Sequence, residues 1–134
     1  MEQVPQKEKP HYLIIGNGRL ARHLTYYFKN LHLNISNWHR NLNLDLDSVL
    51  SDIDIVLLAI SDDAIEHFYN LHLKHKKVVH FSGAVTISGT LGAHPLMMFG
   101  ENFMELTDYM KIPFVCDNKD LFENYFELAN PVFE

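Results

Sequence analysis

The chain has 134 residues, of which 47% are hydrophobic and 21% charged, a composition typical of a single globular domain. Its formal net charge of −6 argues against a general nucleic-acid surface. One cysteine, Cys116, excludes an internal disulfide and fits a reducing compartment. No apolar stretch reaches the ~20 residues that span a bilayer. We therefore expect a cytoplasmic protein without nucleic-acid or membrane partners, with a flexible tail over residues 1–10 and one domain over residues 11–134.

The strongest local signal is an apolar strand, 12–15, that runs directly into a glycine-rich turn and a helix. In a dinucleotide-binding turn, the first glycine permits the tight bend and the second lets the backbone approach a pyrophosphate. An alanine one turn later keeps the helix close to the sheet, and the helix N-terminus offers free N–H groups to the phosphates. In this chain the motif is Gly16-Asn17-Gly18-Arg19-Leu20-Ala21. It predicts dinucleotide binding, and the alternative is that its glycines only make a tight turn.

Short apolar runs then alternate with amphipathic stretches along the rest of the chain. This alternation is typical of an α/β fold with a mostly parallel sheet and helices on both faces. We predict a three-layer sheet of the Rossmann type, in which ligands bind beyond the carboxyl ends of the strands. The expected elements are helix 19–31, strand 35–38, a short helix near 47–50, strand 53–60, helix 61–73, strands 77–81, 91–93 and 112–116, and helix 119–129.

The end of the second strand predicts which dinucleotide binds. A site for NAD usually places an acid there, about 20 residues beyond the glycines, to hold the ribose hydroxyls. This chain instead has Asn37-Trp38-His39-Arg40, without an acid. Arg40 can hold a 2′-phosphate through charge-assisted hydrogen bonds, and His39 can add another. The pattern favours NADP over NAD as cofactor, and the alternative is that Arg40 is a solvated loop residue.

Two later motifs carry a resemblance to a known superfamily. They are His80-Phe81-Ser82-Gly83-Ala84-Val85 and Gly92-Ala93-His94-Pro95-Leu96-Met97-Met98-Phe99-Gly100. Together with the glycine turn, they resemble the Rossmann domain of the 6-phosphogluconate-dehydrogenase-like superfamily. The likeness is greatest to oxidoreductase-like proteins that carry a DUF2520 C-terminal domain, and the His-Pro pair is similar to that of prephenate dehydrogenases. The resemblance covers about residues 12–116 and implies hydride transfer between NAD(P) and a small carbonyl, imine or hydroxy acid.

The resemblance also implies roles for individual residues. The histidine of the His-Pro motif bonds the oxidised hydroxyl in prephenate dehydrogenases, so His94 is the implied polar catalyst. Imidazole titrates near neutrality and can accept a proton as hydride leaves carbon. Ser82 is expected to contact substrate or the nicotinamide amide, whereas Ala59, Ile60 and Ser61 are expected to border the nicotinamide ribose and pyrophosphate. The alternatives are that His94 only caps its strand and that Ser82 only caps the next turn.

The chain departs from that superfamily at its C-terminal end. Members normally carry a C-terminal helical domain that completes the substrate pocket and often dimerises, and we expect this domain to be absent here. Two hypotheses follow: the coenzyme domain of an NADP-dependent oxidoreductase, or a non-catalytic nucleotide-binding or protein-interaction module. An apolar face near 97–103 would favour a homodimer. The nine histidines show no zinc-binding pattern, so no metal is predicted.

Overall fold

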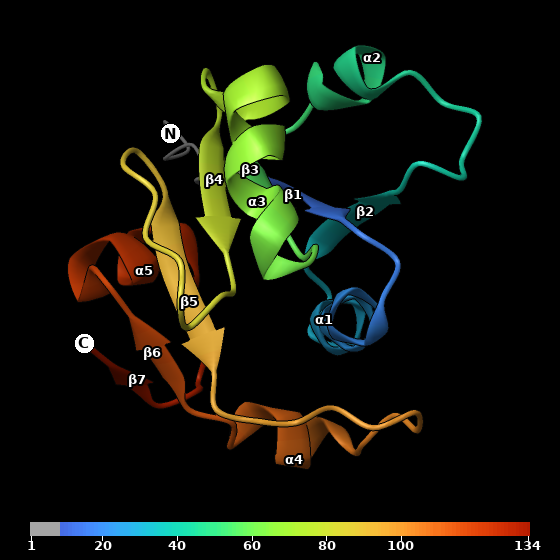
Figure 1. Cartoon of the computed structure of the whole chain (residues 1–134). Helices are drawn as coiled ribbons and strands as arrows, with labels where there is room; N and C mark the ends of the chain where they lie inside the picture. Colours follow the sequence, from blue (N-terminus) through green and yellow to red (C-terminus); the bar gives the residue numbers. More distant parts are fainter. Residues whose placement is uncertain (1–8) are drawn as a thin grey trace, which may run out of the picture.

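A computed structural model describes residues 9–134, so most of the expected N-terminal tail lies outside the described residues. Its strands form one seven-stranded sheet in the order β2-β1-β3-β4-β5-β6-β7 (Figure 1). Strands β1 to β5 run parallel, β6 is antiparallel to β5, and β7 is parallel to β6. The elements are β1 (His11–Ile15), α1 (Arg19–Asn30), β2 (Asn34–Trp38), α2 (Leu46–Leu50), β3 (Ile55–Leu58), α3 (Asp62–Phe68), the π-helical turn η1 (Tyr69–Leu73), β4 (Lys77–His80), β5 (Leu91–Pro95), α4 (Leu106–Met110), β6 (Phe114–Cys116), α5 (Lys119–Tyr125) and β7 (Val132–Phe133).

The side chains of β1 alternate between two hydrophobic cores, one on each face of the sheet. Tyr12 and Ile14 pack with side chains of α1, α4 and α5. Leu13 and Ile15 pack with side chains of α2, α3 and η1 on the opposite face. Each fully buried aliphatic side chain contributes about 2 kcal/mol to the free energy of unfolding. The result is the three-layer, mostly parallel α/β architecture that the alternating sequence pattern predicts.

Helix α1 connects β1 to the edge strand β2 and packs on the first core. Its buried side chains recur at helical spacing, and Leu24, Tyr27 and Phe28 are almost fully buried. The helix ends before His32, whose φ of 60° turns the chain toward β2. The first turn of α1 therefore lies directly beyond the carboxyl end of β1, where the glycine motif places it.

The predicted elements at the C-terminal end are wrong in extent. The expected helix 119–129 ends at Tyr125 because Phe126 is extended (φ −132°, ψ 141°) and stacks on Tyr12 across the first core. Asn130 is buried and donates to the carbonyl oxygens of Tyr109 and Ile112. These contacts turn the chain back, so that β7 pairs with β6. Neither β7 nor α4 follows from the local sequence pattern.

Candidate functional site

The glycine turn is packed tightly against the neighbouring strand β3. Gly16 has φ +136°, and a Cβ atom built on it would lie only 2.2 Å from the carbonyl oxygen of Ala59. No side chain fits there, because the obstructing atom belongs to the backbone. A Cβ atom on Gly18, by contrast, would have no atom within 4 Å. The turn is therefore closed toward the sheet at Gly16 and open to a ligand at Gly18.

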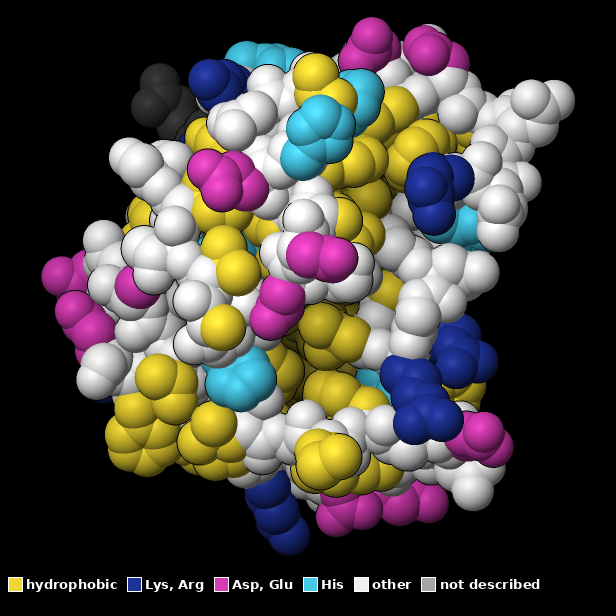
Figure 2. Space-filling view, in the orientation of Figure 1, with side chains coloured by type: hydrophobic (Ala, Val, Ile, Leu, Met, Phe, Trp, Pro, Cys, Tyr) yellow, Lys and Arg dark blue, Asp and Glu magenta, His cyan; other side chains and the backbone are white. Residues whose placement is uncertain are grey.

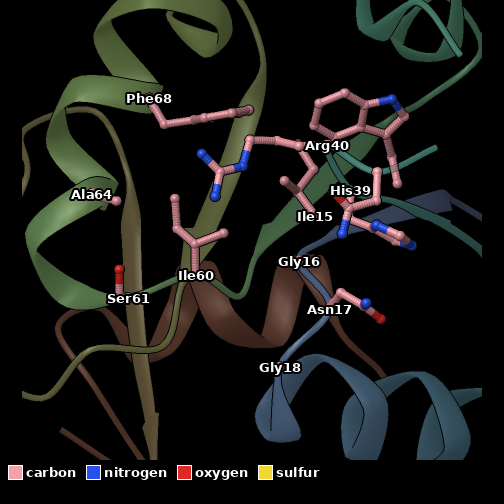
Figure 3. Close-up of a pocket in the computed structure, with 12 residues that line it drawn as sticks. Ile15, Gly16, Asn17, Gly18, His39, Arg40, Ile60, Ser61, Ala64 and Phe68 are labelled. Atoms are coloured by element: carbon pink, nitrogen blue, oxygen red, sulfur yellow. The ribbon is translucent and has the colours of Figure 1, made fainter. Parts of the chain in front are cut away.

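A hollow of about 350 Å³ begins at this turn and lies where the strand order reverses, between β1 and β3 (Figure 3). Ligand pockets in α/β sheets lie at such switch points, and this volume is within their usual range. The hollow brings together seven residues that the sequence analysis singled out for the cofactor: Gly16, Asn17, Gly18, His39, Arg40, Ile60 and Ser61. The other lining residues are Ile15, Trp38, Asn41, Ala64 and Phe68.

Arg40 supplies the cationic group of this hollow. Its guanidinium extends from the end of β2 toward Ile60 and Phe68, whereas the His39 ring points away from them (Figure 3). No Asp or Glu lines the hollow, and within residues 9–134 no carboxylate forms a salt bridge with Arg40. The Nδ1 atom of His39 is buried and has no hydrogen-bond partner. The hollow thus favours an anionic ligand at its β2 side.

Four further residues expected at the cofactor lie near the turn without lining the hollow. The Arg19 guanidinium is 3.7 Å from the Glu101 carboxylate, and both side chains are exposed. Leu20 is partly buried, whereas Ala21 is fully buried, with its Cβ 3.3 Å from the position that a Gly16 Cβ would occupy. Ala59 contacts the turn through its backbone. Ala21 and Ala59 therefore bear on the site through the packing of the turn.

His94 lies within β5 and packs against Phe81 and Gly83, the two residues that flank Ser82 after β4. The His94 Nδ1 atom is 3.2 Å from the carbonyl oxygen of Phe81, and a Cβ atom on Gly83 would lie 3.0 Å from the His94 ring. The Ser82 Oγ atom accepts hydrogen bonds from the backbone N–H groups of Ala84 and Val85, both at 3.1 Å. Because β4 and β5 are parallel, Ser82 and His94 lie near the carboxyl ends of the strands, on the same side of the sheet as the hollow. Neither residue lines the hollow.

His80 lies beneath this pair and is completely buried. Its Nδ1 atom accepts a hydrogen bond from the Ser82 N–H at 3.3 Å, whereas its Nε2 atom has no partner. Burial lowers the pKa of His80, and the negative charges of Asp117 and Asp62 oppose this shift. A neutral His80 is therefore the form that accepts the Ser82 N–H.

Two features could not be found in the same way from the sequence, one in the hollow and one outside it. Ala64 and Phe68 extend the hollow along α3, and the signal was available because residues 61, 64 and 68 follow helical spacing. His23 was missed for a different reason. It is buried in α1, with Nδ1 2.7 Å from the Tyr109 hydroxyl and Nε2 2.7 Å from the Gly100 carbonyl oxygen. Both partners are far away in sequence, so no local pattern indicates this contact.

The face that carries the site has an uneven charge distribution (Figure 2). Lys and Arg side chains gather beside α1 and near the loop that follows β2, whereas Asp and Glu side chains lie over α3. A hollow with hydrophobic side chains on its floor lies between them. Across residues 9–134, no helix is long and apolar enough to span a membrane. That part of the chain also has no cluster of three metal-ligating His, Cys, Asp or Glu side chains.

The sequence matches no protein-family model and no curated protein. Solved structures of several oxidoreductases resemble the fold, among them the following three. An imine reductase variant from Myxococcus stipitatus in complex with NAD⁺ has a TM-score of 0.69 at 14% identity, over 93% of this chain and 55% of that one. A prephenate dehydrogenase from A. aeolicus in complex with hydroxyphenyl propionate and NAD⁺ has a TM-score of 0.66 at 12% identity, over 97% of this chain and 60% of that one. An NADH-preferring ketol-acid reductoisomerase from an uncultured archean has a TM-score of 0.67 at 12% identity, over 90% of this chain and 46% of that one.

These likenesses define the class of fold. The described chain has the Rossmann-type α/β fold that also occurs in these oxidoreductases. It spans only 46% to 60% of the length of these three structures. A shared fold at such low identity does not transfer a substrate or a catalytic residue, because one fold supports many chemistries.

Proposed function

We propose that this chain is the dinucleotide-binding domain of an oxidoreductase-like protein that prefers NADP. The reaction is hydride transfer to or from a small carbonyl, imine or hydroxy-acid substrate. One observation carries the proposal: a single hollow joins the glycine turn to Arg40 at the end of β2. In Rossmann folds, the turn holds the pyrophosphate and the end of the second strand reads the adenosine ribose.

The glycine turn has the geometry that a pyrophosphate requires. Gly18 is the N-cap of α1, and no side chain forms a cap hydrogen bond there. The first N–H groups of an α-helix have no partners within the helix, and together with the helix dipole they attract an anion. The open space at Gly18 leaves the phosphates unobstructed. The turn therefore supports the pyrophosphate half of the cofactor assignment.

The other half of the hollow suits an adenosine 2′-phosphate. Arg40 and Phe68 both line the hollow, so an adenine ring bound there can pack on either side chain. An arginine guanidinium can stack on a flat ring and also form paired hydrogen bonds with a phosphate. The absence of a lining carboxylate removes the usual partner of the free ribose hydroxyls in NAD. These features support a preference for NADP.

His94 and Ser82 are the proposed polar groups of the reaction. A carbonyl oxygen only accepts hydrogen bonds, so the contact with Phe81 places the proton of a neutral His94 ring on Nδ1. The Nε2 atom is then free to take a proton from a substrate hydroxyl during oxidation, or to return one during reduction. The Ser82 hydroxyl already accepts two N–H groups, so its own proton is available to a substrate oxygen. Nicotinamide, when bound, supplies or accepts the hydride.

Calorimetric titration of the chain with NADPH, NADP⁺, NADH and NAD⁺ tests the cofactor assignment. We expect NADPH and NADP⁺ to bind more tightly, because only they carry the 2′-phosphate that pairs with Arg40. Arg40→Gln should weaken NADPH binding by about tenfold or more, and NADH binding by much less, because NADH loses only the stacking contact. Lys111→Gln is the matched control, because it removes one exposed positive charge outside the hollow. Failure of all four nucleotides to bind would refute the proposal.

The exposed side chains after β5 favour the second candidate, a non-catalytic module that retains nucleotide binding. Leu96, Met98 and Phe103 are large and hydrophobic, and they are at least half exposed. Exposed apolar groups of this kind often contact a partner protein. Turnover with a panel of carbonyls, imines and hydroxy acids separates the candidates. An oxidoreductase loses turnover in His94→Ala while its NADPH affinity is retained, whereas the module binds the cofactor without any turnover.

A further inference from the structure

A second hollow, of about 300 Å³, lies between α1 and the edge strand β2. It shares only Gly16 and Asn17 with the hollow assigned to the dinucleotide. The Asn17 side chain points away from that first hollow (Figure 3). The remaining lining residues of the second hollow are Arg22, Thr25, Tyr26, Lys29, Asn37 and Phe103.

Two cationic side chains without acidic partners border this second hollow. Arg22 and Lys29 are seven residues apart in α1, so they lie two turns apart on one side of the helix. Both are exposed, and among residues 9–134 neither forms a salt bridge with a carboxylate. No Asp or Glu lines the hollow. In a chain with a net charge of −6, this local excess of positive charge marks a place for an anion.

An aromatic wall stands beside these cations. The rings of Tyr26 and Phe103 are stacked, with centroids 4.3 Å apart and an interplanar angle of 4°. Phe103 is nevertheless half exposed, so the pair still offers an uncovered ring surface. The Asn37 side chain forms the polar side of the hollow and is held in place, because its amide donates hydrogen bonds to the carbonyl oxygens of Ile14 and Gly16. One small cavity thus combines a flat apolar surface, neutral polar groups and two positive charges.

We propose that the second hollow binds a small phosphorylated aromatic compound. Its phosphate contacts Arg22, which can form paired hydrogen bonds, and Lys29, which supplies a compact charge. Its ring packs against the wall formed by Tyr26 and Phe103, since aromatic stacking adds to the burial of apolar area. This site does not depend on the proposed dinucleotide function, because Arg40, Phe68 and the open face of Gly18 line the other hollow.

Phenyl phosphate is the probe for this site, with phenol and inorganic phosphate as its two halves. We expect titration with phenyl phosphate to shift the backbone amide resonances of Thr25, Tyr26 and Lys29, and each half alone to bind more weakly. The double substitution Arg22→Gln/Lys29→Gln should weaken binding by about tenfold or more, since both phosphate contacts are lost. Lys74→Gln/Lys111→Gln removes the same charge from exposed positions outside both hollows and should bind normally.

Three results would overturn the proposal. One is the absence of any shift at the Thr25, Tyr26 and Lys29 amides at the highest soluble probe concentration. Another is equal binding of phenol and phenyl phosphate, which would leave no role for the cations. The third is a set of shifts confined to Gly18, Ala64 and Phe68, which would place the phosphate in the first hollow. Binding of NADPH is measured separately, so failure here leaves the dinucleotide proposal intact.

Discussion

Gly16 and Gly18 are two residues apart in the same motif but are constrained by different physical causes. Gly16 is required by its positive φ and by the carbonyl oxygen of Ala59, whereas Gly18 faces open space. We expect Gly16→Ala to lower the free energy of unfolding by about 3 kcal/mol, because the new Cβ atom meets backbone that cannot move freely. Urea denaturation measures this change.

Gly18→Ala is the matched control for that substitution. It should cost less than about 1 kcal/mol of stability, since its Cβ atom meets no neighbour and only the N-cap preference changes. If Gly18 faces a pyrophosphate, the same variant should bind NADPH more weakly despite its stable fold. Equal destabilisation by both substitutions would contradict this division between a packing glycine and a binding glycine.

The buried His80 makes stability depend on pH. Burial lowers the pKa of His80 from its ordinary value of 6.5, although Asp117 and Asp62 oppose the shift. The unfolded chain therefore takes up a proton at this residue at a higher pH than the native chain does. Stability is retained above pH 6.5 and decreases as the pH falls below that value, because the unfolded state then binds more protons.

Urea denaturation between about pH 8 and pH 5 tests this dependence. His80→Gln removes the titrating group but keeps an oxygen that can accept the Ser82 N–H. We expect the free energy of unfolding of this variant to fall less steeply on acidification than that of the unsubstituted chain. His75→Gln, at an exposed position, should leave the pH dependence unchanged. If the free energy of unfolding depends on pH identically in His80→Gln and in the unsubstituted chain, His80 is not the group responsible for the pH dependence.

At the scale of elements, His23 connects α1 to the segment between β5 and α4. The Gly100 carbonyl only accepts, so the His23 Nε2–H donates to it and Nδ1 accepts from the Tyr109 hydroxyl. Tyr109 in turn accepts a hydrogen bond from the Met104 N–H. This chain of bonds holds the segment that carries Phe103 against Tyr26.

His23→Leu tests this connection. We expect a loss of about 2 kcal/mol or more in the free energy of unfolding, since buried polar partners lose their hydrogen bonds. Hydrogen exchange at the Met104 amide should also become faster, because its acceptor Tyr109 is no longer held. Arg22→Gln, one position earlier on the exposed side of α1, should change neither quantity. Unchanged exchange at Met104 in His23→Leu would show that the segment is held by other contacts.

Elements that depend on a short local pattern were predictable, whereas those that depend on distant partners were not. Strand β1, helix α1 and strand β2 follow their predicted ranges closely, because apolar periodicity sets which face is buried. Helix α5 ends early because Phe126 stacks on Tyr12, more than a hundred positions away. The same limit applies to the site: helical spacing indicates Phe68, but no local signal indicates His23.

At the scale of the whole molecule, cofactor binding should stabilise the fold. A ligand that binds only the native state adds about 2.7 kcal/mol when its concentration is one hundred times its Kd. For a domain of this size, we expect NADPH at that excess to raise the Tm by roughly 10 °C. Thermal unfolding followed by circular dichroism measures the shift. If calorimetry shows binding but the Tm does not move, the bound nucleotide does not select the native state.

The amino-acid sequence by itself determined the features that have local physical causes. The glycine turn requires backbone freedom at Gly16, the alternation of apolar runs sets a layered α/β fold, and Arg40 provides a cation at the end of β2. Only the tertiary structure decided which distant groups meet. It brought Arg40 and Phe68 into the lining of one hollow and placed Phe103 against Tyr26 in another. It also made β6 run antiparallel to β5. Such contacts depend on packing between segments remote in sequence, which local propensity does not encode.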